Sequence, residues 1–236
     1  MGEQGEIYRS DIPADAVEGV VSPFRKDGHA TWFEKRACKL DGEIVGYRQY
    51  NQDGSLAMET PMREGRKHGT EYTWEDNGTG PYIMLAEPYE NGLVHGTARQ
   101  WSPSGKLMGT YTMVRGTGFD LWRQVDERGR LYVAEIHSMK EGSPNGFEWW
   151  VREDQRSVSH EVHWVEGKRH GIERQWYYAG DIDPDYPEFY INDTVVSKDT
   201  YIEKQKIDTY LPEYRVEDDR NERAFPDEIL KAMRSA

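Results

Sequence analysis

The sequence predicts a mainly β fold: an elongated, single-layer antiparallel meander of serial β-hairpins that ends in a short α-helical C-terminal cap. The first observation is a pattern, G-x-x-H-G-x-x-x-x-W, that occurs with the same internal spacing in Glu64–Trp74, Asn91–Trp101 and Glu166–Trp176. The second is that glycines typical of turns recur every 23 to 27 residues. Repetition at such a period indicates a repeat array, and each period has room for two strands and two turns.

Composition is the third observation. Hydrophobic residues make up only 36% of the 236 residues and charged residues 31%, and the mean hydropathy is -0.92. This is little for a thick apolar interior. Aromatic residues nevertheless reach 12%, with 8 Trp and 15 Tyr, which is not typical of a disordered chain. The combination favours a thin sheet whose surface is covered by aromatic rings.

Three segments follow one another along the chain. Residues 1–22 form an acidic N-terminal lead-in, residues 23–196 a β-hairpin repeat array, and residues 197–236 an acidic helical C-terminal segment. The array begins near Pro23, and its first clear turn is Asp27–Gly28.

Two kinds of turn alternate in the array. Asp-Gly and Asn-Gly pairs are strong hairpin signals, because both central residues of a type I′ turn need a positive φ. We therefore assign this geometry to the short glycine turns. The short turns are Asp53–Gly54, Asn77–Gly78, Ser104–Gly105 and Arg128–Gly129. The second kind has the form Gly-x-x-x-Gly: Gly42/Gly46, Gly65/Gly69, Gly92/Gly96, Gly142/Gly146 and Gly167/Gly171.

The strands show the alternation expected of a sheet. Thr70, Tyr72 and Trp74 share one face in a strand that follows the second kind of turn. Where His precedes the second glycine, Trp follows that glycine by five residues. In other copies an aromatic residue follows by four: Tyr50, Trp122 and Trp150. A shift of one residue moves a side chain to the other face unless a bulge absorbs it, and both outcomes remain open.

The last quarter of the chain predicts one more hairpin and two helices. Phe189–Val196 forms the hairpin across Asn192–Asp193. Ser197 is a suitable N-cap for a helix over residues 198–208, and Pro226 can begin a helix that ends near Arg234. Residues 181–236 contain 15 acidic and 8 basic residues. We expect the helices to cap the open end of the sheet; the alternative is that they bind the partner.

Charge and cysteine content narrow the classes of function. A net charge of -13 disfavours binding to nucleic acid and to anionic membranes. The lone cysteine, Cys38, excludes an intrachain disulfide and a zinc site built on several cysteines. The polar N-terminus does not resemble a signal peptide, and no apolar stretch is long enough to span a membrane. We expect a cytoplasmic protein with no cofactor and no metal.

No residue pattern indicates catalysis. His68, His95 and His170 recur at one repeat position, but equivalent positions in successive hairpins lie ~10 Å apart, too far to share a metal. We interpret them as turn residues rather than as a metal or pH-sensing ladder. The surroundings of Cys38 do not form a nucleophile elbow, so we expect a buried or incidental thiol. The chain contains no glycine-rich phosphate loop.

One copy carries a family resemblance. Its sequence, from Tyr89 to Leu107, is YENGLVHGTARQWSPSGKL. It resembles the MORN repeat class, and most of all the bacterial variant found in antitoxin components of toxin–antitoxin systems. The resemblance covers roughly residues 23–200. It implies serial β-hairpins in a single sheet and a non-catalytic role in protein binding, scaffolding or lipid contact.

The aromatic ladder is the best candidate for a binding surface. Rings stacked across strands normally hold a thin sheet together, but aromatic residues beside arginine are also typical of interface hot spots. The candidate partner-binding residues are Tyr72, Trp74, Arg99, Trp101, Arg174 and Trp176. We expect an antitoxin-like or adaptor protein that grips another protein, such as a toxin or effector encoded nearby. A MORN-type membrane-associated scaffold is the alternative, and an enzyme is the less favoured third.

Overall fold

The computed structural model describes residues 8–23 and 33–234. It is mainly β, with 55% strand and 9% helix, which confirms the predicted fold class of serial antiparallel hairpins with short C-terminal helices. The chain divides into two compact units, at the turn between Arg115 and Gly116. The predicted turn Asp27–Gly28 lies outside the described residues.

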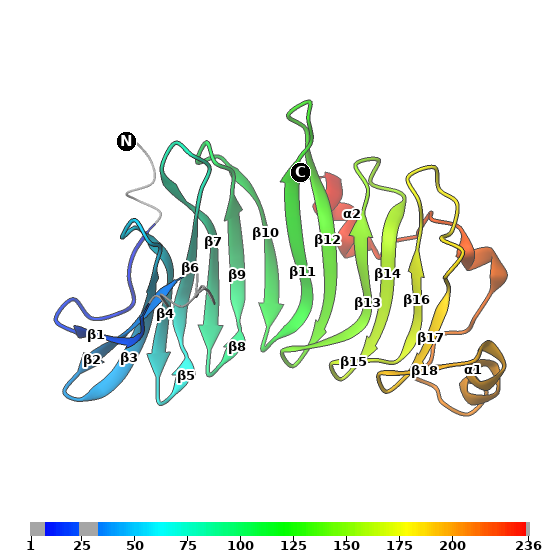
Figure 1. The fold of residues 1–236 in the computed structure, drawn as a ribbon, viewed down its shortest axis with the longest axis horizontal. Helices are drawn as coiled ribbons and strands as arrows, with labels where there is room; N and C mark the ends of the chain where they lie inside the picture. The colour runs from blue at the N-terminus through cyan, green and yellow to red at the C-terminus, as the bar shows by residue number, and fades with distance from the viewer. Residues whose placement is uncertain (1–7, 24–32, 235–236) are drawn as a thin grey trace. The chain divides into compact units, whose positions relative to one another are not determined.

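Unit 1 is an antiparallel meander in which each strand pairs with the next along the chain (Figure 1). Strand β1 lies inside the segment predicted as a lead-in and pairs with β2, so residues 17–22 belong to this sheet. The strands are β1 (Val17–Ser22), β2 (Glu34–Leu40), β3 (Glu43–Tyr50), β4 (Leu56–Arg63), β5 (Arg66–Lys67), β6 (Gly69–Asp76), β7 (Pro81–Glu90), β8 (Leu93–Val94), β9 (Gly96–Trp101) and β10 (Leu107–Val114).

Unit 2 continues the same hairpin pattern and ends in helices. Its strands are β11 (Thr117–Val125), β12 (Leu131–Lys140), β13 (Ser143–Val151), β14 (Val158–Val165), β15 (Lys168–Arg169), β16 (Gly171–Gln175), β17 (Glu188–Ile191) and β18 (Thr194–Val196). Its helices are α1 (Lys198–Gln205), a short 3₁₀ helix (Val216–Asp219) and α2 (Asp227–Arg234). Within the described residues, no helix combines the length and the apolar character needed to cross a bilayer.

The prediction of type I′ geometry for the short glycine turns is wrong, and this geometry occurs in the other class of turn. In the short glycine turns only the glycine has a positive φ, as at Gly54 (86°), so these turns are not type I′. Both central residues are left-handed in the other class, for example Asn91 (51°) and Gly92 (89°). The short glycine turns are loops of more than two residues. In the turn at Gly54, the Asn51 N–H closes the loop by donating to the Ser55 carbonyl at 2.9 Å. A single left-handed glycine is sufficient to close a loop of this length.

The His-Gly pair of the repeat motif marks a bulge. Strand pairing is interrupted at this pair in each of the three copies, which splits the strands into β5/β6, β8/β9 and β15/β16. At the interruption, the His68 N–H donates to the Pro61 carbonyl at 3.0 Å. The histidine therefore lies where the ladder changes register, which agrees with the role of a turn residue.

The register also decides which face each aromatic residue occupies. Arg48 is the cross-strand partner of Glu59, and Glu59 is the cross-strand partner of Tyr72, so these side chains lie on one face. Tyr50 lies two residues beyond Arg48, and Trp74 lies two residues beyond Tyr72, so Tyr50 and Trp74 share that face. Bulges absorb the shift at that copy. Trp150 instead pairs with His160, the neighbour of Glu161, and so lies on the face opposite to Arg174. Trp122 is in the same row as Trp150.

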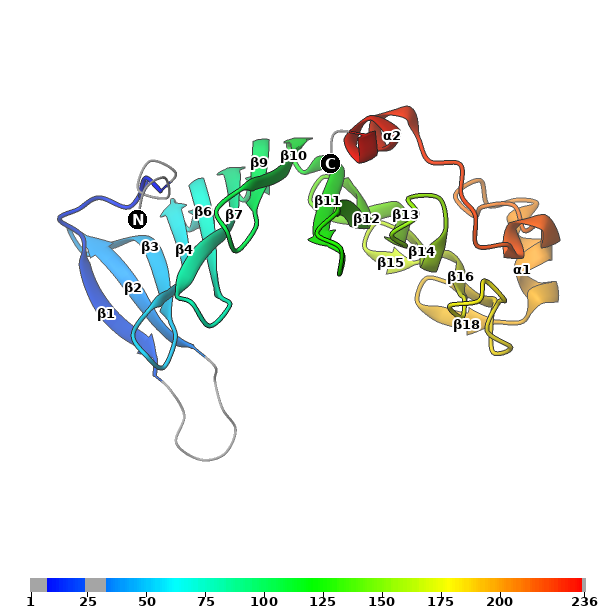
Figure 2. The ribbon, with the colours of Figure 1, turned by 90° about the horizontal axis from the view of Figure 1, so that it is seen from above.

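Helix α1 packs against the last hairpin. Ser197 caps it by accepting a hydrogen bond from the Thr200 N–H, and Tyr201 is fully buried beside Phe189 and Ile172. Helix α2 contacts β12 rather than the last strand. In Figure 2 it lies over one side of the strands β12 and β13. Of the two helices, α1 covers the end of the sheet as expected, whereas α2 covers a sheet face.

The N-terminal segment of unit 1 also packs on the sheet. Ile12 is buried, and a Cβ atom at Gly46 would come within 2.2 Å of its Cδ1 atom. Glycine is therefore needed at position 46 to admit the Ile12 side chain, not to supply an unusual φ.

Candidate functional site

In unit 2, the C-terminal segment lies across the arginine and tryptophan of the last repeat motif. The Arg174 Nε atom donates to Asp219 Oδ1 at 3.0 Å, and the Trp176 indole N–H donates to the Asp219 main-chain carbonyl at 2.7 Å. The Arg223 guanidinium covers the Trp176 ring, 4.8 Å from its centroid. Both Arg174 and Trp176 are only 3% exposed. They hold a segment of their own chain.

Glu161 is the buried centre of this contact. One of its carboxylate oxygens accepts from Arg174 Nη1 at 2.9 Å, and the other accepts from Arg223 Nε at 2.6 Å and from the Trp149 indole at 2.7 Å. Burial alone would raise the pKa of Glu161, but the hydrogen bonds and charges of Arg223 and Arg174 outweigh it and lower this pKa. The Phe225 ring meets Trp149 edge-on at 5.5 Å, which extends the contact.

In unit 1, the N-terminal segment covers part of the corresponding face. The Tyr8 ring meets Tyr72 and Trp74, each at 5.1 Å between centroids. The Tyr8 hydroxyl donates to the buried carboxylate of Glu59 at 2.8 Å, and Arg48 pairs with the same oxygen at 2.7 Å. Burial, followed by the neighbouring Glu59 carboxylate, raises the pKa of Tyr8 to about 12. Tyr8 therefore fixes the N-terminal segment to the aromatic ladder.

An open groove remains beside this contact, over the face of strands β6, β7 and β9. Its volume is about 330 Å³. The groove residues are Thr70, Tyr72, Ala86, Pro88, Thr97, Arg99 and Trp101. Arg99 is its only charged residue and is exposed. Within the described parts of the chain, the Arg99 guanidinium has no hydrogen bond or ion pair. We call this surface the Arg99 groove.

The six predicted partner-binding residues thus divide into two groups. Tyr72, Arg99 and Trp101 line the Arg99 groove, and Trp74 packs against the same cluster. Arg174 and Trp176 lie in unit 2 beneath their own C-terminal segment. Four further members of these contacts were not predicted from the sequence: Glu161, Asp219, Arg223 and Tyr8. The acidic run Glu217–Asp219 in the sequence is the one signal that could have pointed to Asp219.

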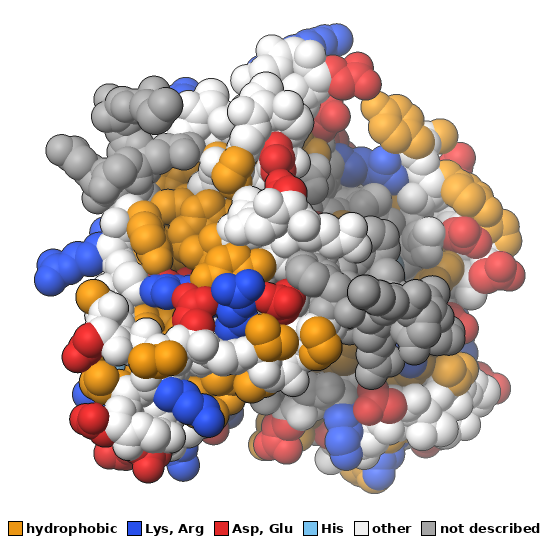
Figure 3. Space-filling view, turned by 60° about the vertical axis from the view of Figure 1, so that its left-hand side comes forward, with side chains coloured by type: hydrophobic (Ala, Val, Ile, Leu, Met, Phe, Trp, Pro, Cys, Tyr) orange, Lys and Arg blue, Asp and Glu red, His pale blue; other side chains and the backbone are white. Residues whose placement is uncertain are grey.

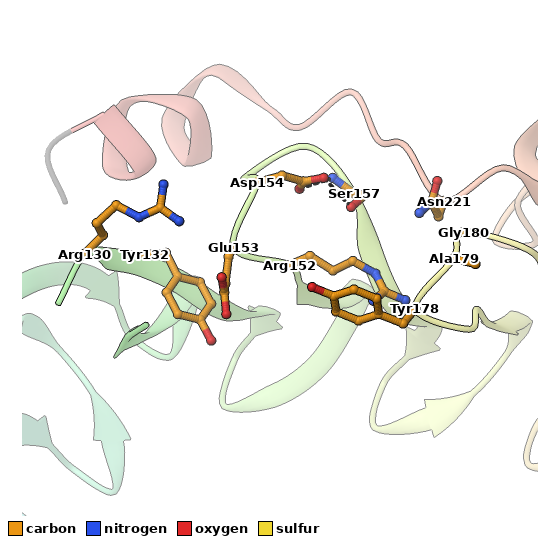
Figure 4. Close-up of a pocket in the computed structure, with 10 residues that line it drawn as sticks. All are labelled: Arg130, Tyr132, Arg152, Glu153, Asp154, Ser157, Tyr178, Ala179, Gly180 and Asn221. Carbon is orange, nitrogen blue, oxygen red and sulfur yellow. Dashed lines mark hydrogen bonds between the residues drawn. The ribbon is translucent and has the colours of Figure 1, made fainter. Parts of the chain in front are cut away.

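Another cavity, larger than the Arg99 groove, lies in unit 2 and holds about 570 Å³. Figure 4 shows its lining side chains, which include Arg152, Glu153, Asp154 and Tyr178. Arg152 donates to the main-chain carbonyls of Trp176 and Tyr177 at 3.0 and 2.8 Å. Asp154 accepts from the main chain and hydroxyl of Ser157 at 2.8 and 2.6 Å. These hydrogen bonds hold the turns around the cavity.

Two of the three repeated histidines bind the turn of the next hairpin, whereas the Nδ1 atom of His68 is buried without a hydrogen-bond partner among the described residues. His95 Nδ1 accepts from the Arg115 N–H at 3.1 Å, and His170 Nδ1 accepts from the Asn192 N–H at 3.2 Å. Within residues 8–23 and 33–234, no group of three or more His, Cys, Asp or Glu side chains is placed to hold a metal ion. Cys38 is fully buried, which agrees with the expectation of a buried thiol. Burial raises the pKa of this thiol.

A second charged cluster lies near the edge of unit 1. Glu18 of strand β1 pairs with Arg48 at 2.7 Å and with Arg36 at 3.4 Å. Figure 3 shows one face of the molecule, on which hydrophobic side chains lie beside a group of Lys or Arg and Asp or Glu side chains. Arg36 and Arg48 have a carboxylate partner in Glu18, so they differ from Arg99.

The chain was compared with protein-family models, with curated proteins and with solved structures, and none of the three comparisons finds a match.

Proposed function

We propose that this protein is a non-catalytic protein-binding repeat module, of the antitoxin-like or adaptor kind, that binds a protein partner through the Arg99 groove of unit 1. One observation carries the proposal. The arginine and tryptophan of the repeat motif are covered by an internal segment in unit 2, whereas their counterparts Arg99 and Trp101 border an open groove in unit 1.

The chemistry of the groove suits a protein partner. Tyr72 and Trp101 offer rigid aromatic surface, and Arg99 offers an exposed cation. Aromatic residues and arginine are enriched in the well-packed centres of interfaces. Aromatic side chains also lose little conformational entropy on binding, because they have only two rotatable side-chain bonds. The proposal therefore keeps Tyr72, Trp74, Arg99 and Trp101 as partner-binding residues. It does not include Arg174 and Trp176, because both are covered by the C-terminal segment of their own chain.

A photo-crosslinking experiment tests the proposal. p-Benzoylphenylalanine is placed at Thr97, which lines the groove, or at Lys106, an exposed residue outside the groove that serves as the matched control. Each variant is irradiated in cells of the source organism. We expect a crosslinked protein of one defined mass from the Thr97 variant and not from the Lys106 variant.

The same preparation separates the alternative function. Co-sedimentation of the chain with anionic liposomes, together with the absence of a specific crosslinked protein at Thr97, would contradict a protein-binding role and support a membrane-associated scaffold.

A further inference from the structure

Unit 2 shows how the repeat motif holds one acidic residue at two points. Arg174 contacts the Asp219 carboxylate at 3.0 Å, and Trp176 contacts the main-chain carbonyl of the same residue at 2.7 Å. Arg174 thus binds the charged carboxylate, and the Trp176 indole N–H binds the main chain. Arg174 lies on strand β16 and Trp176 directly follows the end of that strand, and both side chains reach Asp219. We call this arrangement the Arg–Trp clamp.

Arg99 and Trp101 occupy the same two positions of the motif in unit 1. Their donors are unused: within residues 8–23 and 33–234, neither the Arg99 guanidinium nor the Trp101 indole N–H has a hydrogen-bond partner. The same pair of donors therefore borders the Arg99 groove of unit 1.

One difference between the two pairs of donors decides what the pair in unit 1 can bind. Across the strand from Arg174 lies Glu161, but across from Arg99 lies Ala86. Arg174 thus has an internal carboxylate in addition to Asp219, whereas Arg99 has none. Arg223 pairs with Glu161 in unit 2. Because Ala86 takes the place of Glu161 in unit 1, a ligand there does not need a residue equivalent to Arg223.

We propose that Arg99 and Trp101 clamp an aspartate in an acidic segment of the partner protein, with its carboxylate on Arg99 and its main-chain carbonyl on Trp101. This inference rests on the proposed function and names the chemistry of the partner. The chain as a whole is acidic, with a net charge of -13, but Arg99 is the only charge in the groove. Exposed charges more than about 8 Å away are largely screened at physiological ionic strength. The local charge therefore favours a carboxylate.

The probe is a fluorescently labelled synthetic peptide with the sequence of residues 213–222, added to the full-length protein. This peptide carries Asp219 and stops before Arg223, whose partner Glu161 is replaced by Ala86 in unit 1. Binding is followed by fluorescence anisotropy. The indole ¹H–¹⁵N signal of Trp101, assigned with Trp101→Phe, reports the position of the peptide.

We expect the peptide to shift the Trp101 indole signal. We expect roughly tenfold weaker binding to Arg99→Gln, because a charge-assisted hydrogen bond is lost. A peptide with Asp219→Asn should lose affinity to a similar degree. Arg63→Gln is the matched control, because Arg63 is also an exposed arginine of unit 1 but lies outside the groove; its affinity should equal that of the unmodified chain.

Several outcomes would overturn the inference: no binding, equal binding by Arg99→Gln or by the Asp219→Asn peptide, or a shift at Trp176 instead of Trp101. An Arg99-dependent dimer in analytical ultracentrifugation would identify a second copy as the occupant and would also overturn it. If the peptide result fails but the Thr97 crosslink persists, the proposed function stands with a different ligand chemistry. If both fail, the function fails as well.

Discussion

The Arg223 guanidinium lies 2.6 Å from the Glu161 carboxylate, although 62 residues separate the two in the sequence. Arg223 belongs to the segment between the short 3₁₀ helix and α2, and Glu161 belongs to strand β14. The pair is nearly buried, with side-chain exposures of 12% and 3%. The C-terminal segment is therefore attached to the sheet by ionic contacts in addition to apolar packing.

We predict that Arg223→Ala destabilises the protein by about 3 kcal/mol, because it removes one partner of a buried carboxylate. Thermal unfolding and limited proteolysis of residues 213–234 measure the effect, and proteolysis should become faster. Arg220→Ala is the matched control, since Arg220 is exposed and its side chain makes no ion pair with the described residues. Equal stability of the two variants would show that the ion pair contributes nothing.

Arg99 and Arg174 share a repeat position, but we predict opposite sensitivities to substitution. Arg174→Ala should cost about 3–5 kcal/mol of unfolding free energy, because Arg174 is buried between Glu161 and Asp219. Arg99→Ala should change it by less than about 0.5 kcal/mol, as is usual for exposed sites. Urea unfolding measures both values. A large loss for Arg99→Ala would mean that the residue stabilises the fold and is not held free for a ligand.

The repeat period, the hairpins and the starts of the helices could be predicted from the sequence, because they depend on local signals, whereas α1 ends at Gln205 and not at residue 208 as predicted. Glycine spacing marks the turns, alternation marks the strands, and Ser197 and Pro226 mark the starts of the helices. The class of turn with two left-handed residues was not recognised, since the residue before glycine varies between Asp41, Glu64 and Asn91. The glycine at the next position carries the signal, and its partner needs only to tolerate the left-handed region.

The candidate site was predicted only in part. Its aromatic and arginine residues recur in the motif, so the repeat reveals them. Their partners Tyr8, Glu161 and Asp219 come from segments that do not repeat, and contacts between such distant segments leave no periodic trace. The choice of face for Trp150 was equally out of reach, because it depends on bulges that shift the register within the strands.

We predict that Tyr8→Phe destabilises unit 1 by about 1–3 kcal/mol, because it removes the hydroxyl that donates to the buried Glu59 carboxylate. Tyr8→Ala should cost more, since the ring contacts with Tyr72 and Trp74 are also lost. Tyr210→Phe is the control, because Tyr210 is 69% exposed. Chemical denaturation of the three variants measures the differences, and a neutral Tyr8→Phe would show that Arg48 alone satisfies Glu59.

The Cys38 thiol should react slowly with a thiol reagent in the folded protein. It is 0% exposed, and burial raises its pKa, so both access and the thiolate fraction are low. We expect complete modification only when urea unfolds unit 1, with a midpoint that matches unfolding followed by circular dichroism. Rapid reaction in buffer would indicate frequent local opening of strand β2.

Stability should decrease with rising pH because of His137. Its Nδ1 atom lies 2.6 Å from Glu148, and its Nε2 atom lies 3.3 Å from Glu135. Burial opposes the charged imidazole, but the contact with Glu148 and the charges of Asp120 and Glu135 outweigh burial and raise the pKa of His137. The folded state therefore binds this proton more tightly than the unfolded state. Its contribution is complete below the unfolded pKa of about 6.5 and is lost as pH rises through the higher folded pKa. His137→Gln should remove this decrease, and parallel pH profiles of unfolding free energy for the two proteins would contradict the assignment. His163 affects the unfolding free energy separately, and equally in the unmodified protein and in His137→Gln. Burial lowers the pKa of His163, so its effect on stability is confined to pH below about 6.5.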